Sequence, residues 1–191
     1  MKNNLGPKTL LITCGLPATW KTETSAEVAK IKGYPILRSD LIRLEVLKGE
    51  DVFDPKVAGN LNKRLSVYDE MFRRADDAAG EGSVILDATF VTQDLRRHAA
   101  EIAAKHGLTF VILETSCTQE VSVARLQKRT KEKYESNALT VEAYLANKRK
   151  FEPVDLDDLK RLHPQLKILK LTVDTCHDSP EDWYIIGMEK R

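Results

Sequence analysis

Short apolar runs alternate along the chain with longer stretches in which apolar residues recur every three or four positions. The runs predict buried strands, and the stretches between them predict helices that cover the strands. Because the two patterns alternate, we expect an α/β fold with a mainly parallel sheet and helices on both faces. Five runs carry the strand pattern: Thr9–Thr13, Tyr34–Arg38, Ser83–Asp87, Leu108–Leu113 and Leu166–Val173.

The same periodicity, together with residues that begin or end helices, predicts the helical segments. The most regular pattern follows Pro55, where apolar residues from Val57 to Ala79 recur at steps of three or four before Gly80 and Gly82 end the helix. The other predicted helices cover residues 26–30, 40–48, 92–107, 140–151 and 180–188, and one begins at Thr118. We find no internal repeat and expect a single domain over residues 1–191.

The segment between the first strand and its helix fits a phosphate-binding (Walker A) loop, Gly15 to Thr22. That motif needs a glycine, four residues, a second glycine, a lysine and a serine or threonine, so that backbone N–H groups surround phosphate oxygens. Lys21 is placed to reach the terminal phosphates, and the Thr22 hydroxyl is placed to hold Mg²⁺. The residues expected to bind the phosphates are Gly15, Ala18, Thr19, Trp20, Lys21 and Thr22.

Two residues of this segment depart from the motif. Trp20 stands where the second glycine belongs, and any Cβ there risks backbone strain or a clash with the phosphate. Glu23 places a carboxylate in the first turn of the helix whose amino end attracts the phosphate. One interpretation is an altered or weakened nucleotide site. The other is that Glu23 points to solvent and favours the helix dipole.

An acid and an arginine at the start of the second helix are candidates for catalysis. Asp40 and Arg43 lie three residues apart, hence on one helix face, just beyond the carboxyl end of the second strand, where parallel sheets bind ligands. Asp40 is placed to accept the proton of a substrate hydroxyl, and Arg43 to hold the acceptor or the transferring phosphate. An ordinary first-turn ion pair explains the same spacing.

Asp87 ends an apolar strand, where a carboxylate is costly to bury unless it faces a cation, a water or a hydroxyl. We expect it to contact Mg²⁺ through water; capping of the following turn is the alternative.

A basic patch follows the fourth strand, where a closing lid would belong. Arg125 and Arg129 are i,i+4 neighbours there, and Lys128, Lys131 and Lys133 extend the patch. The polar residues 131–137 are expected to form the lid over bound phosphates. A solvated charged face is the alternative interpretation.

The order of these motifs resembles the P-loop kinases related to polynucleotide kinase, chloramphenicol phosphotransferase and gluconate kinase. The resemblance covers nearly the whole chain. It rests on residues 15–22, 38–43, 84–90, 125–129, 136–138 and 151–153. It implies a P-loop NTPase fold: a three-layer α/β/α sandwich with a five-stranded, mainly parallel sheet and a small helical lid.

The resemblance also implies a function and a set of site residues. The function is ATP-dependent, Mg²⁺-dependent transfer of a phosphoryl group to a hydroxyl of a small molecule or a polynucleotide end, with Asp40 as the base. The implied catalytic residues are Lys21, Asp40, Arg43 and Arg129. The residues implied to bind the nucleotide are the loop residues named above and the lid arginines Arg125 and Arg129. The residues implied to associate with the metal are Thr22 and Asp87.

Composition narrows the setting of this chemistry. Hydrophobic residues make up 42% and charged residues 31% of the chain, as in a soluble globular domain, and the net charge of +1 gives no global field for a long nucleic acid. Cys14, Cys117 and Cys176 lack metal-ligand spacing and suit a reducing compartment. Without an apolar run of membrane length or a secretory signal, the chain is expected to be cytoplasmic.

Three functions fit these residues. The acids and arginines favour an ATP-dependent kinase, whereas Trp20 and Glu23 favour a nucleotide-free binding or regulatory module in which Trp20 fills the phosphate pocket. Binding of nucleic-acid ends by the basic patch is the third. No motif selects an acceptor, and the loop after Val173, expected to contact the base, shows no preference between adenine and guanine.

Overall fold

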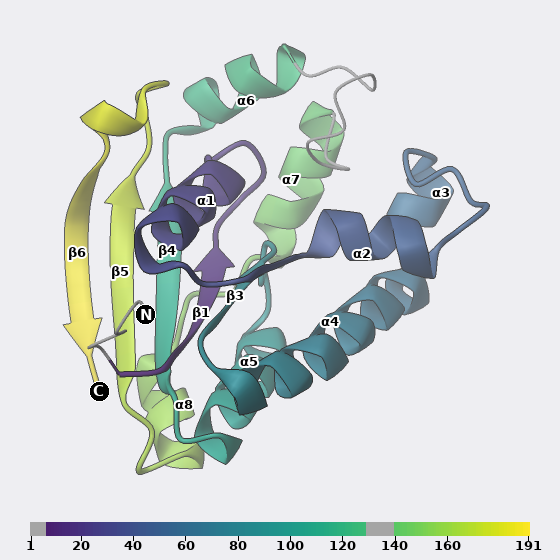
Figure 1. Ribbon diagram of the computed structural model, residues 1–191. Coiled ribbons are helices and arrows are strands. Elements are labelled where there is room, and N and C mark those ends of the chain that lie inside the picture. The colour runs from purple at the N-terminus through teal and green to yellow at the C-terminus, as the bar shows by residue number, and fades with distance from the viewer. Residues whose placement is uncertain (1–6, 129–139) are drawn as a thin grey trace.

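The computed structural model describes residues 7–128 and 140–191. Its strands form one sheet in the order β2-β3-β1-β4-β5-β6, in which all neighbouring pairs are parallel except β5 and β6 (Figure 1). The strands are β1 (Thr9–Cys14), β2 (Ile36–Arg38), β3 (Val84–Asp87), β4 (Thr109–Ser116), β5 (Ile168–Asp174) and β6 (Tyr184–Lys190). The predicted α/β class and mainly parallel sheet are confirmed, but the sheet has six strands rather than five.

The sixth strand replaces the helix predicted over residues 180–188, so that prediction was wrong. Only a short 3₁₀ helix, η1 (Pro180–Asp182), forms there, and β6 then pairs with β5. A proline followed by acids is typical of a first helical turn, which misled the prediction. The aromatic and β-branched side chains from Trp183 to Ile186 instead favour an extended backbone, which β5 stabilises by pairing.

The helices mostly lie where the apolar periodicity predicted them. The long helix after Pro55 is divided because Asn60 begins a new helix, its side chain accepting a hydrogen bond from the Lys63 N–H. One short helix, α8, was not predicted. The helices are α1 (Lys21–Lys32), α2 (Ser39–Val46), α3 (Pro55–Ala58), α4 (Leu61–Glu81), α5 (Gln93–Lys105), α6 (Gln119–Gln127), α7 (Val141–Lys150) and α8 (Leu156–Leu162).

Helices cover both faces of the sheet, which gives three layers (Figure 1). Because side chains alternate along a strand, successive strand residues serve different cores. Leu11, Ile85 and Val111 pack on one face with residues of α1. Leu10, Leu86 and Ile112 pack on the opposite face with residues of α4 and α5. The predicted α/β/α sandwich is therefore confirmed.

Arg96 on α5 ties two distant segments together inside the protein. It is fully buried, and its guanidinium donates hydrogen bonds to the Gln93 amide oxygen and to the backbone carbonyls of Phe90, Val91, Glu152 and Pro153. It also lies over the Phe151 ring, 5.3 Å from the ring centroid. Residues 151–153 are thereby fixed to the turn that follows β3.

Asp158 on α8 provides a test of the packing between α8 and α5. Its carboxylate accepts hydrogen bonds from Arg97 Nε at 2.8 Å and from Gln93 Nε2 at 3.1 Å, and these bonds hold the pKa of Asp158 well below its usual range. We expect Asp158→Asn to lower the free energy of unfolding by about 1–3 kcal/mol at pH 7, measured by urea unfolding.

The acid dependence of that effect follows from the direction of the pKa shift. A carboxyl group whose folded pKa is depressed contributes its stability above the unfolded pKa of about 3.9, and loses it as the pH falls towards the folded value. The difference between wild type and Asp158→Asn should therefore shrink below about pH 4. Asp77→Asn, at an exposed ion pair, is the control and should cost little. A difference that stays constant down to pH 2 would contradict this account.

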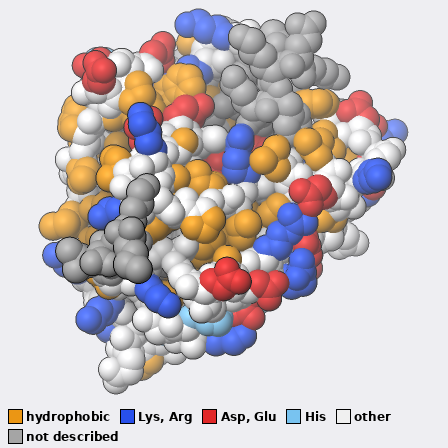
Figure 2. Space-filling view, viewed as in Figure 1, with side chains coloured by type: hydrophobic (Ala, Val, Ile, Leu, Met, Phe, Trp, Pro, Cys, Tyr) orange, Lys and Arg blue, Asp and Glu red, His pale blue; other side chains and the backbone are white. Residues whose placement is uncertain are grey.

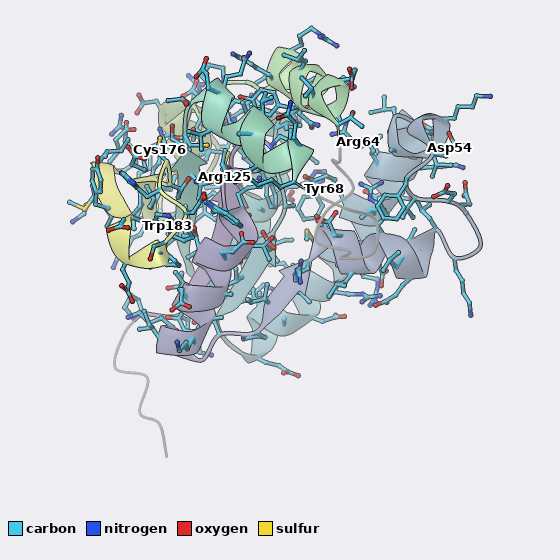
Figure 3. The ribbon with its side chains drawn as sticks, turned by 90° about the horizontal axis from the view of Figure 1, so that it is seen from above. Asp54, Arg64, Tyr68, Arg125, Cys176 and Trp183 are labelled. Carbon is cyan, nitrogen blue, oxygen red and sulfur yellow. The ribbon has the colours of Figure 1, made fainter. Side chains whose placement is uncertain are left out.

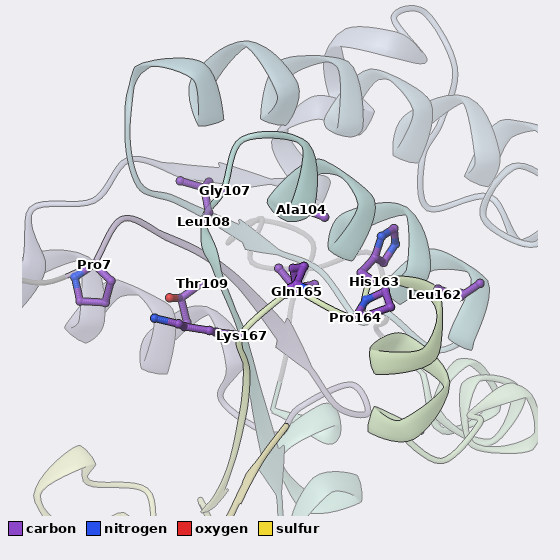
Figure 4. A pocket seen from close by; sticks show the side chains of 11 residues that line it. Pro7, Ala104, Gly107, Leu108, Thr109, Leu162, His163, Pro164, Gln165 and Lys167 are labelled. Atoms are coloured by element: carbon purple, nitrogen blue, oxygen red, sulfur yellow. The ribbon is translucent and has the colours of Figure 1, made fainter.

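A hollow of about 450 Å³ lies at the amino ends of β4 and β5 (Figure 4). Thr109, His163 and Lys167 are among the residues that line it. Parallel sheets bind ligands at the carboxyl ends of their strands, so the candidate site lies at the other edge of the sheet.

Among the described helices, none is long and apolar enough to cross a membrane.

Candidate functional site

The loop between β1 and α1, predicted to bind phosphate, contains three residues with positive φ angles. Gly15, Ala18 and Trp20 have positive φ angles of 142°, 62° and 57°. Residues in this conformation between right-handed ones turn successive N–H groups towards one point, where an anion binds. Only glycine fits at position 15, because a Cβ there would lie 2.6 Å from the carbonyl oxygen of Thr115. The left-handed backbone at Ala18 and Trp20 is therefore compatible with the predicted phosphate-binding loop.

The side chains of Thr19 and Lys21 both form hydrogen bonds within this loop. Thr19 is buried, and its hydroxyl hydrogen-bonds to the Thr115 hydroxyl at 2.7 Å and to the Leu16 carbonyl, so only its backbone is available to a ligand. Lys21, the first residue of α1, donates from Nζ to the same Leu16 carbonyl at 2.6 Å. The ammonium group therefore lies over the loop that it was predicted to serve.

Thr22 and Asp87, the two predicted metal-associated residues, are in direct contact. Thr22 Oγ1 donates to Asp87 Oδ2 at 2.7 Å, and Thr13 Oγ1 donates to Asp87 Oδ1 at 3.1 Å. Asp87 is 5% exposed, so these hydroxyls satisfy a carboxylate that would otherwise be costly to bury. A hydroxyl next to a carboxylate is a group of hard oxygen ligands that suits Mg²⁺.

Two further residues at this carboxylate were missed by sequence reasoning. Thr13 is a polar residue within an apolar strand, a signal that could have been used. Arg38 pairs with Asp87 in the register of β2 and β3, and its Nε lies 3.7 Å from Asp87 Oδ2. That neighbourhood depends on strand order, which the local sequence does not encode. In the described part of the chain, no three His, Cys, Asp or Glu side chains form a metal-binding group.

Asp40 and Arg43 lie on α2, whose first residue directly follows β2. Asp40 is thus two residues beyond Arg38, the β2 neighbour of Asp87, so it is held near the metal-associated pair. Both side chains are half-buried. The predicted base therefore lies at the carboxyl edge of the sheet, two strands away from β1 and its loop.

Tyr68 on α4 adds a residue that the sequence did not single out. Its hydroxyl accepts a hydrogen bond from the Phe90 N–H at 3.2 Å and lies 3.5 Å from the Thr89 hydroxyl. Burial raises the pKa of Tyr68, while the charges of Arg64 and Arg43 act in the opposite direction. Seen from above, Tyr68 and Arg64 lie on one side of the site, and Arg125 and Trp183 lie on the other (Figure 3).

Arg125 on α6 is buried against the loop. Its guanidinium lies over the Trp20 ring, 4.8 Å from the ring centroid, and Nη1 donates to the Ala18 carbonyl at 3.3 Å. Nε pairs with Asp178 at 3.0 Å. The Trp183 ring stacks on Trp20 with centroids 6.4 Å apart. Arg125 therefore adjoins the predicted nucleotide site, but it contacts an indole of the protein itself.

Several predicted lid elements cannot be compared with the structure. Arg129, the segment 131–137 and the motif at 136–138 lie outside the described residues. Within the described part, α6 and α7 lead into and out of that segment. The predicted roles of Arg129 and of the lid remain proposals.

A family match decides where the chain belongs. The model of a family described as an AAA domain matches residues 10–154, which include the loop, Asp40, Asp87 and Arg125. The chain belongs to the AAA domain family. Uncharacterized proteins of Mycobacterium tuberculosis and Mycobacterium bovis match this chain at 31% identity over 127 residues, or 63% of the chain. The chain spans about a quarter of the length of these curated relatives, since the match covers 25% of each.

Solved structures show which fold the AAA domain adopts here. A sugar kinase from Janibacter sp. superposes with a TM-score of 0.62 at 16% identity, over 92% of this chain and 89% of that one. A gluconokinase from Sinorhizobium meliloti gives 0.57 at 17% identity, over 90% and 84%. Likeness at this identity establishes the fold. The predicted resemblance to P-loop kinases is therefore confirmed for the fold.

Proposed function

We propose that this protein is a P-loop phosphotransferase, which holds the phosphate chain of a donor on residues 15–22 and transfers the terminal phosphoryl group to a hydroxyl. The observation that carries the proposal is the contact of Thr22 with Asp87, together with the Lys21 ammonium on the Leu16 carbonyl of a loop that has three positive φ angles. Phosphoryl transfer depends mainly on such positioning and charge neutralisation.

ATP with Mg²⁺ is the donor that the resemblance implies, and its phosphate part fits the residues present. The loop N–H groups and Lys21 would hold the phosphates, and Thr22 and Asp87 would hold Mg²⁺ directly and through water. Mg²⁺, when bound, neutralises charge on the phosphate chain. The base of ATP fits less well, because Trp20 and Trp183 stack beside Arg125.

Residues of α2 would act on the acceptor. Asp40 accepts the proton of the attacking hydroxyl, and Arg43 orients the acceptor or the transferring phosphate. The structural neighbours are named for a sugar and for gluconate, which makes hydroxyl-rich small molecules the first acceptors to assay. A polynucleotide end is the second acceptor class to assay. It comes second because basic and acidic side chains are interspersed on the face shown in Figure 2, whereas a long nucleic acid favours a continuous basic surface.

A nucleotide-free binding or regulatory module is the second candidate function. The packing of Arg125 and Trp183 on the Trp20 ring favours it, because an aromatic ring there takes space beside the loop. The two candidates differ in whether Mg²⁺ and a phosphate chain bind at all.

For either function, we propose a cytoplasmic location, which the free thiols of all three cysteines fit.

Calorimetric titration of the Lys21→Met variant tests the proposed function. Wild type should bind Mg²⁺-tripolyphosphate or Mg²⁺-ATP, and Lys21→Met should weaken that binding by about tenfold or more, because the ammonium contributes charge-assisted hydrogen bonds. Lys30→Met, at an exposed position of the same helix, is the matched control and should bind like wild type. Failure of wild type to bind either compound would leave the module as the function.

A further inference from the structure

Two segments that are distant in the sequence contact the Trp20 indole. Arg125 of α6 covers the ring at 4.8 Å, and Trp183, which precedes β6, stacks on it at 6.4 Å with an interplanar angle of 29°. Trp183 Nε1 in turn donates to the His177 carbonyl at 2.8 Å. We call these three side chains, Trp20, Arg125 and Trp183, the indole cage.

The loop after β5, expected to contact a nucleotide base, is part of the same arrangement. Arg125 Nη2 donates to the backbone carbonyls of Thr175, Cys176 and His177 at 2.8, 3.0 and 3.0 Å. With Nε on Asp178 and Nη1 on the Ala18 carbonyl, each nitrogen of the guanidinium already has an acceptor from the protein. The arginine that the resemblance assigns to the nucleotide is thus committed to the protein.

The central residue of the cage, Trp20, is unfavourable for folding in two respects. Trp20 adopts the left-handed conformation with φ 57°, which a bulky side chain rarely does. Its buried Nε1 has no hydrogen-bond acceptor among the described residues. Glycine, the residue of the motif, would avoid both costs. Costs of this kind concentrate at functional sites, which points to a role for the ring itself.

The phosphate-binding groups lie outside the cage. Lys21 Nζ donates to the Leu16 carbonyl, and Thr22 Oγ1 donates to Asp87, whereas the cage is formed by Arg125 and Trp183 on the Trp20 ring. We propose that the donor site accepts a phosphate chain that carries no base, such as tripolyphosphate, because the Trp20 indole stacks on Arg125 in place of a nucleotide base. This inference rests on the proposed phosphotransferase function and specifies its donor.

The transfer balances with such a donor. The acceptor oxygen forms a bond to the terminal phosphorus of tripolyphosphate, and the bond from that phosphorus to its bridging oxygen breaks. Pyrophosphate leaves with the electron pair of the broken bond. The hydroxyl proton of the acceptor passes to the Asp40 carboxylate and from there to solvent.

Calorimetry with matched ligands tests this proposal on the whole chain. Methyl triphosphate and ATP are both triphosphate monoesters, so they differ only in the alcohol that carries the chain. In the presence of Mg²⁺, wild type should bind tripolyphosphate and methyl triphosphate about tenfold or more tightly than ATP. Trp20→Gly should raise the affinity for ATP by about tenfold or more while changing that for methyl triphosphate much less.

A second variant separates the ring from the backbone strain. Trp20→Ala removes the indole but keeps a Cβ at the left-handed position, so it should show the same gain for ATP as Trp20→Gly. ATP bound by wild type as tightly as methyl triphosphate would overturn the inference and leave the phosphotransferase proposal standing. Binding of no triphosphate at all would overturn both. If the Trp20 variants do not fold, the wild-type comparison alone decides.

Discussion

Asp40→Asn is expected to slow phosphoryl transfer by about 10²- to 10⁴-fold while leaving the affinity for the donor unchanged. Asparagine keeps the size of the side chain and its capacity for hydrogen bonding, but it does not take up a proton at neutral pH. The residues proposed to bind phosphate lie on a different loop, so donor affinity should not depend on this carboxylate. Initial rates with a hydroxyl-rich acceptor, together with calorimetry of donor binding, measure both quantities.

A control on the same helix makes this result specific. Glu45→Gln also removes a carboxylate from α2, but Glu45 is exposed and pairs with Arg74 on α4, so its rate of transfer should match wild type. If Asp40 only forms a first-turn ion pair, Asp40→Asn should lower the unfolding midpoint without slowing transfer. An unchanged rate in Asp40→Asn would remove Asp40 from the mechanism.

Arg96→Leu is expected to lower the free energy of unfolding by about 3–5 kcal/mol, which would leave a domain of ordinary stability largely unfolded on warming. The substitution removes the hydrogen-bond donor from the buried Phe90 carbonyl and from the partly buried carbonyls of Glu152 and Pro153. It also releases residues 151–153 from the turn after β3. Urea unfolding followed by circular dichroism gives the size of the loss.

Arg73→Leu is the control for this prediction. It removes an arginine of similar length whose ion pairs with Glu70 and Asp77 are exposed, and such pairs are worth about 0–1 kcal/mol. Arg96→Lys should fall between the two, because an ammonium keeps the charge but cannot reach several carbonyls at once. A loss below about 1 kcal/mol in Arg96→Leu would show that these carbonyls find other donors.

The sequence predicted those parts of the site that are encoded locally. The loop, Lys21 and Thr22 follow from a contiguous motif, and Asp87 follows from an acid at the end of an apolar strand. Thr13 and Arg38 act on Asp87 through side-chain direction and strand register, which only the assembled sheet determines. The prediction of a helix over residues 180–188 was wrong for the same reason, because pairing of β6 with β5 outweighs the helical start signal at Pro180.

Arg125 and Arg96 show a further limit of sequence patterns. Spacing placed Arg125 on the helix that follows the fourth strand but did not show that its guanidinium turns inward onto Trp20. Arg96 lies among residues that predict an amphipathic helix, and nothing in that pattern distinguishes it from Arg97, its more exposed neighbour. In both cases the burial of a charged side chain depends on carbonyls from segments far away in the chain.

The stacked pair of indoles has a practical consequence. Trp20 and Trp183 are the two tryptophans of the chain, so all of its tryptophan fluorescence originates beside the loop. No emission from a distant indole dilutes the signal, and stacking makes the two rings report on each other. The wild-type protein therefore carries its own optical probe: a compound that separates the rings or fills the loop should change the emission spectrum, without any label.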